Sequence, residues 1–174
     1  MAKEIKQKKW EGKDTVEIRG VDGEIVWHVL EDFCNLHKWI PIDTCYKIGG
    51  IEGQPGLIRY CASAKKGVTK DAEPTIKWFK EKLLKIDPIQ RCLSYEIVDN
   101  NMGFKNYVAI MKVLPLQING GDDGKSEGCM IEWSCVCDPI EGWSLQDLNN
   151  YIGSFLKSLG NKIQLAYSYS PSKI

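Results

Sequence analysis

The sequence lacks a net charge and lacks any long apolar run. Its 174 residues carry 23 Lys and Arg against 23 Asp and Glu, so no long-range field attracts polyanions and nucleic acid is not an expected partner. Every candidate helix is interrupted by charge, so no segment is predicted to span a bilayer. The lysine-rich first nine residues lack the apolar stretch of a secretory signal, which predicts a cytoplasmic protein.

The motifs of common cofactor and metal chemistry are also missing. There is no G-x-G-x-x-G, no Walker loop, no H-E-x-x-H and no C-x-x-C, so we expect no cofactor and no metal. The cysteines number seven, which is odd, and Cys135 and Cys137 lie too far apart along a strand for an ordinary disulfide. We therefore expect buried, reduced thiols.

What is present predicts one domain with a sizeable core. Hydrophobic residues make up 43% of a chain of ordinary single-domain length, so residues 1–174 are expected to form one unit, with residues 1–8 as a disordered tail. Alternating and helical patterns, separated by Gly, Pro and Asn clusters, divide the chain. They predict a strand over 10–19, a helix capped by Asp22, a short helix around 35–39, and strands over 44–52, 57–63, 76–86, 92–98, 105–114 and 129–138.

The C-terminal segment has the strongest helical signal. Residues 144–147 (SLQD) have the form of a capping box and open a helix that is expected to end near Tyr167. Its apolar positions form one stripe: Leu148, Ile152, Phe155, Leu156, Leu159, Ile163 and Ala166. Six consecutive strands without intervening helices imply antiparallel pairing. The predicted fold class is therefore α+β, a helix-grip fold with a curved seven-stranded antiparallel sheet around the long helix, two short helices and a ligand cavity between them.

Strand alternation assigns a few polar side chains to the concave face. Glu81 alternates with the apolar Phe79 and Leu83, and Arg59 alternates with the apolar Leu57 and Cys61. A buried carboxylate needs a cation or a raised pKa, and Arg59 is the available cation. The same alternation turns further residues inward: Tyr95 and Tyr107, with Leu93, Met111 and Trp133 as apolar walls. An ion pair on the outer face fits the alternation about equally well, and both tyrosines also fit ordinary core positions.

Several short segments resemble, in order, the plant lachrymatory factor synthase family. They are residues 10–13 (WEGK), 35–39 (NLHKW), 56–60 (GLIRY), 81–83 (EKL), 94–95 (SY), Tyr107, 132–134 (EWS), 140–142 (IEG) and 160–163 (GNKI). This family is a branch of the Bet v 1/START-like superfamily of polyketide cyclases, dehydrases and lipid transport proteins, which has the helix-grip fold. The resemblance spans roughly residues 9 to 167.

The resemblance implies an activity and a site. It implies a cofactor-independent isomerase that moves a proton from oxygen to carbon, turning 1-propenesulfenic acid into propanethial S-oxide. Arg59 and Glu81 resemble the family's catalytic pair, and Tyr95, Tyr107 and Trp133 resemble residues of its pocket. The implied partners are a small hydrophobic or sulfur-containing metabolite and an upstream lyase that produces it.

Two departures put the substrate in question. Phe155 stands where the family's synthase has a pocket tryptophan. The segment between Tyr60 and Trp78 is longer than the corresponding segment of that synthase. A non-catalytic carrier of a hydrophobic plant metabolite is the alternative function, and the same acid/base pair acting on another reactive intermediate is a third. The gate and latch sequences of the related abscisic-acid receptors are absent, which disfavours a hormone receptor of that kind.

Overall fold

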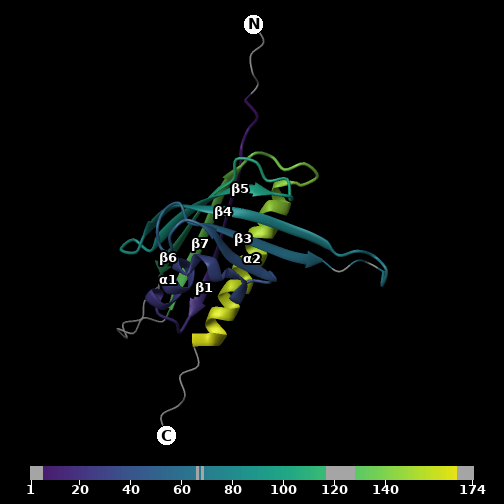
Figure 1. The fold of residues 1–174 in the computed structure, drawn as a ribbon. Coiled ribbons are helices and arrows are strands. Elements are labelled where there is room, and N and C mark those ends of the chain that lie inside the picture. The colour runs from purple at the N-terminus through teal and green to yellow at the C-terminus, as the bar shows by residue number, and fades with distance from the viewer. Residues whose placement is uncertain (1–5, 66, 68, 117–127, 168–174) are drawn as a thin grey trace.

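The computed structural model describes residues 6–65, 67, 69–116 and 128–167. Most of the predicted N-terminal tail lies outside these residues. No helix of the described chain is long and apolar enough to cross a membrane. Seven strands form one curved antiparallel sheet with the order β1-β7-β6-β5-β4-β3-β2, so β1 and β2 are its edges (Figure 1). The strands are β1 (Trp10–Arg19), β2 (Thr44–Gly49), β3 (Ile58–Lys65), β4 (Thr75–Asp87), β5 (Cys92–Asn100), β6 (Val108–Pro115) and β7 (Gly128–Cys137).

Two short helices follow β1. Helix α1 (Gly23–Glu31) begins where predicted, since the Asp22 carboxylate accepts a hydrogen bond from the backbone N–H of Glu24 at 2.8 Å. The next segment is a 3₁₀ helix, η1 (Phe33–Lys38), which begins two residues earlier than the predicted short helix. Its contacts run to β2 and β3, so η1 covers that side of the sheet.

The long helix α2 (Leu145–Tyr167) confirms the predicted capping box. The backbone N–H of Ser144 donates to the Asp147 carboxylate at 2.7 Å, and the backbone N–H of Asp147 donates to Ser144 Oγ at 3.1 Å. Figure 1 shows α2 lying along one face of the sheet. The apolar stripe is buried from Leu148 to Ile163 except for Phe155, which is partly buried, and Ala166 at the end of the helix is exposed.

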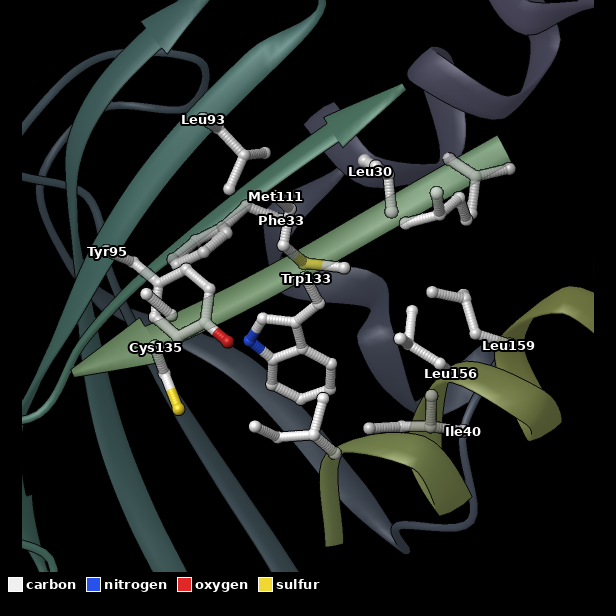
Figure 2. Packing of buried hydrophobic residues seen from close by; sticks show 14 of the residues in the cluster. Leu30, Phe33, Ile40, Leu93, Tyr95, Met111, Trp133, Cys135, Leu156 and Leu159 are labelled. Carbon is white, nitrogen blue, oxygen red and sulfur yellow. The ribbon is translucent and has the colours of Figure 1, made fainter. Parts of the chain in front are cut away.

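The core lies between the concave face and α2. Figure 2 shows Tyr95, Met111 and Trp133 of the sheet facing Leu156 and Leu159 of the helix. Helix α2 packs mainly against β1 and β7, whereas η1 packs against β2 and β3. The interior therefore has two differently built sides, and its buried charged side chains, Arg59 and Glu81, come from β3 and β4.

Candidate functional site

Arg59 and Glu81 form an ion pair inside the protein. They are direct register partners on β3 and β4, and the two residues are 4% and 5% exposed. Arg59 Nε donates to Glu81 Oε2 at 2.7 Å, and Nη2 lies 2.5 Å from the same oxygen. Both contacts are made to the same carboxylate oxygen, Oε2. The outer-face alternative is therefore wrong for this pair.

Segment η1 holds the guanidinium from the other side. Arg59 Nη1 donates to the backbone carbonyl of Phe33 at 2.7 Å, and the guanidinium carbon lies 3.7 Å from the centroid of the Phe33 ring. A planar guanidinium that is held by a carboxylate, a carbonyl and an aromatic face is fixed in orientation. Arg59 is thus a buried positive charge that is already held in one orientation.

Burial and charge shift the pKa values of both members of the pair. Burial raises the pKa of Glu81 above 4.5, because the charge and hydrogen bond of Arg59 offset the desolvation only in part. Burial disfavours the charged form of Arg59, but Glu81 and smaller electrostatic contributions from neighbouring groups together outweigh this effect and raise the pKa of Arg59. The arginine stays charged, and Glu81 is a carboxyl group that holds a proton more readily than an ordinary glutamate.

The two predicted tyrosines lie beside this pair. Tyr95 and Tyr107 are each 2% exposed, with ring centroids 6.3 Å apart. Burial, followed by neighbouring negative groups, raises the pKa of both phenols well above 10. Both hydroxyls therefore stay protonated at neutral pH, so they can donate hydrogen bonds to a ligand but cannot act as bases.

Two small cavities flank the guanidinium, each with a volume of ≈ 20 Å³. By that measure each holds about one water-sized group. The first cavity (the acid/base cavity) is lined by Leu36, Ile40, Arg59, Phe79, Glu81, Tyr95, Ile97, Tyr107, Trp133, Tyr151 and Phe155. The second (the apolar cavity) is lined by Val29, Leu30, Asp32, Phe33, Leu36, Arg59, Leu93, Met111 and Leu159. Arg59 and Leu36 line both and so separate them.

Similarity to known proteins supports this description of the fold. Residues 9–161 match the protein family described as polyketide cyclase/dehydrase and lipid transport. The chain belongs to this family. Its fold is similar to that of ginseng major latex-like protein 151 from Panax ginseng, with 19% identity, a TM-score of 0.68, and coverage of 91% of this chain and 97% of that one. It is also similar to the protein XoxI from Bacillus cereus, with 21% identity, a TM-score of 0.64, and coverage of 91% and 95%.

Membership of the polyketide cyclase/dehydrase and lipid transport family carries a general expectation of a hydrophobic ligand in the interior. The identities to the solved structures are low, so these structures support the fold and not a specific activity. The helix-grip prediction is confirmed. Specificity like that of lachrymatory factor synthase remains a prediction.

The predicted pocket residues divide into three groups. Phe79, Trp133 and Phe155 line the acid/base cavity, while Leu93 and Met111 line the apolar cavity. Leu57 and Leu83, however, line neither cavity. They form a bonded pair one pleat beyond Arg59 and Glu81, with Leu83 N–H donating to the Leu57 carbonyl at 2.8 Å, and are 0% and 1% exposed. They are core residues because neighbouring side chains enclose them completely.

Several lining residues were not expected. Phe33, Leu36 and Ile40 come from η1 and the turn after it, and Tyr151 comes from α2. The Tyr151 ring lies 4.7 Å from that of Phe155, centroid to centroid, in an edge-on arrangement. Tyr151 lies four residues before Phe155, so helical spacing alone predicts that the two side chains share one face of α2.

Trp133 supplies an unpaired donor in the acid/base cavity. The residue is 8% exposed, and among the described residues no atom accepts a hydrogen bond from its Nε1. A buried N–H without an acceptor is costly, so a ligand oxygen at this position would recover free energy. No cluster of His, Cys, Asp and Glu in the described chain is arranged to hold a metal ion.

Proposed function

We propose that the protein is a cofactor-independent isomerase that moves a proton within a small, reactive substrate, in the manner of lachrymatory factor synthase. The observation that carries the proposal is the buried Arg59–Glu81 pair at the wall of the acid/base cavity. A buried ion pair adds little to stability compared with apolar residues of the same size. Its position beside a cavity therefore favours a role in chemistry.

The proposed substrate class is an alkenyl sulfenic acid such as 1-propenesulfenic acid. Glu81 accepts the proton of the S–OH group and returns a proton to the carbon two bonds from sulfur, which converts the C=C–S–OH unit into the HC–C=S=O unit of the thial S-oxide. Charge collects on the substrate oxygen during this transfer. The fixed guanidinium of Arg59 stabilises that charge without reorganising.

Each remaining polar group has a binding role in this proposal. The protonated hydroxyls of Tyr95 and Tyr107 and the unpaired Nε1 of Trp133 act as hydrogen-bond donors to the sulfenate oxygen and do not exchange protons. The apolar walls exclude water, which limits condensation of the sulfenic acid.

The cavity volume favours a small substrate. A site with room for about one water-sized group has to open for any ligand, and its lining includes Leu36 of η1 and Ile40 just after it, which lie outside the sheet and α2. Movement of these residues would admit a molecule of a few heavy atoms. A carrier of a large lipid would need far more rearrangement.

The test is a coupled assay. The purified protein is incubated with a cysteine sulfoxide lyase and an alkenyl cysteine sulfoxide, and the thial S-oxide is measured by gas chromatography with mass spectrometry. The proposal predicts product above the level of lyase alone. If the protein binds the sulfenic-acid analogue but forms no product from it or from related substrates, the carrier function replaces the isomerase.

A further inference from the structure

Two cysteines far apart in sequence touch on β2 and β3. Cys45 and Cys61 are register partners, and the thiol of Cys61 donates a hydrogen bond to Cys45 Sγ at a sulfur–sulfur distance of 3.4 Å. Cys45 is 7% exposed and Cys61 is 0% exposed. Register partners on antiparallel strands have their Cα atoms about 4.5–5.5 Å apart, within the separation that a disulfide spans, so a moderate approach of the two side chains would bring the sulfurs to bonding distance.

The surroundings differentiate the two thiols. The hydrogen bond from Cys61, together with the charge of Arg59, outweighs burial and lowers the pKa of Cys45 to about 6. The same hydrogen bond, followed by burial, raises the pKa of Cys61. The pair therefore contains one sulfur with thiolate character, which is the nucleophile in thiol oxidation, and one thiol that keeps its proton.

The position of β2 gives small molecules access to this pair. It is an edge strand, hydrogen-bonded on one side to β3, and its register shifts between Lys47 and Gly49. Edge segments with few bonded neighbours open locally at a lower free energy than central strands. A small oxidant can reach Cys45 in such an opening even though the closed thiols are buried.

We propose that Cys45 and Cys61 form a reversible disulfide with hydrogen peroxide or an organic hydroperoxide as oxidant, and that this bond loosens η1 over the site. The Cys45 thiolate attacks a peroxide oxygen, the O–O bond breaks, and hydroxide leaves as Cys45 becomes a sulfenic acid. The sulfur of Cys61 then attacks Cys45 Sγ, the S–O bond breaks, and the Cys61 proton leaves with the oxygen as water. Two thiols are oxidised and one hydrogen peroxide molecule is reduced to two waters.

The coupling to η1 follows from the other contacts of Cys45. Its sulfur also interacts with the backbone of Leu36 and the side chain of His37, both in η1. Leu36 lines both cavities, and the Phe33 carbonyl of the same segment binds Arg59. A disulfide turns Cys45 Sγ toward Cys61 and withdraws it from η1. Formation of this disulfide does not require the isomerase activity.

The chemical test counts thiols. Full-length protein is treated with hydrogen peroxide, the remaining thiols are alkylated, and the intact mass and cross-linked peptides are measured. We expect the loss of two of the seven thiols, a peptide link between positions 45 and 61, and full recovery with dithiothreitol. Cys92→Ser is the matched control because Cys92 is more exposed than either thiol of the pair. The Cys92→Ser protein should still form the link between Cys45 and Cys61. A pair that stays alkylatable while other thiols oxidise would overturn the proposal.

The conformational test uses the exposed Lys38 in η1. We expect trypsin to cleave after Lys38 several-fold faster in the oxidised protein than in the reduced protein. Peroxide treatment of Cys45→Ser, or of Cys61→Ala where the serine variant does not fold, should leave the cleavage rate unchanged. Equal rates for oxidised and reduced wild type would overturn the coupling to η1.

Discussion

The two sides of the interior are built by opposite means. On the side of β1 and β7, α2 lies so close to the sheet that a methyl group added at Gly12 would come within 2.7 Å of Ile152, and one at Gly160 within 2.8 Å of Val16. On the side of β3 and β4, η1 stands in place of the long helix, and the interior holds Arg59 and Glu81, the only buried charged residues of the described chain.

This difference separates stability from function. On the β1 side α2 packs closely against the sheet, and close packing is where most of the stability of a domain originates. The β3 side keeps two desolvated charges and two small cavities, both of which cost free energy. We expect substitutions on the first side to change stability alone, and substitutions on the second side to change turnover beyond any effect on stability.

The largest effect is expected from Arg59→Leu. This change leaves the Glu81 carboxylate buried without its cation, so we expect a loss of about 3–5 kcal/mol in the free energy of unfolding and loss of turnover. Urea unfolding measures the first and the coupled assay measures the second. In the double variant Arg59→Leu, Glu81→Leu, stability should return while turnover stays absent. A double variant as unstable as the single one would mean that the pair is retained for structure.

A smaller effect is expected from Gly160→Ala on the packed side. The new methyl group would meet Val16 Cγ2, which cannot move far, at a cost that exceeds the better helix propensity of alanine. We expect a net loss of about 1 kcal/mol in urea unfolding and an unchanged kcat. In a Val16→Ala background the loss should vanish. A fall in kcat for folded Gly160→Ala protein would break the separation of the two sides.

Phe155→Trp tests whether the shape of the acid/base cavity affects turnover. Phe155 lies against Tyr151 and Trp133 at the acid/base cavity, so a larger ring should fill that cavity. We expect kcat/KM for the substrate to change roughly tenfold, as is typical of modest changes in pocket volume. Leu165→Trp is the control, because Leu165 lies on the same helix and is 78% exposed. Equal values for both variants and wild type would make Phe155 ordinary core.

The pH dependence is the finest test. Glu81 has to be ionised to accept a proton, so kcat should fall as the pH drops through its raised pKa, above 4.5. The sign for stability is opposite. The folded protein holds the Glu81 proton more tightly than the unfolded chain, so this contribution to stability is complete below pH 4.5 and is lost as the pH rises through the raised pKa. Melting curves should show this trend in wild type and not in Glu81→Gln.

Strand alternation and the capping box were enough to predict the sheet and the long helix. These signals are local: alternation is visible within a single strand, and the capping box joins residues only three positions apart. For Arg59 and Glu81, alternation fitted the inward and outward directions about equally, and the family resemblance favoured the inward one. Tyr151 contacts Phe155 on α2, although the predicted apolar stripe did not include it. The role of η1 was missed because a 3₁₀ segment has no long period, and its Phe33 contact with Arg59 joins residues 26 positions apart.

The cysteine pair shows the same limit of sequence reasoning. Cys135 and Cys137 drew attention because they are close in sequence, although their alternation keeps them apart. Cys45 and Cys61 meet only because β2 pairs with β3 in a particular register, and no short motif encodes that register. The same holds for the cavity volume, which depends on how all the lining side chains pack.

The most direct test of the central claim is the turnover of Glu81→Gln. Glutamine keeps the shape and an oxygen acceptor but cannot exchange a proton, so kcat should fall roughly 10²–10⁴-fold while the affinity for a substrate analogue changes little. Thermal melting confirms that the protein compared is folded, since Arg59 loses its counter-charge in this variant. The account predicts this loss in folded protein. Wild-type turnover in folded Glu81→Gln protein would contradict it.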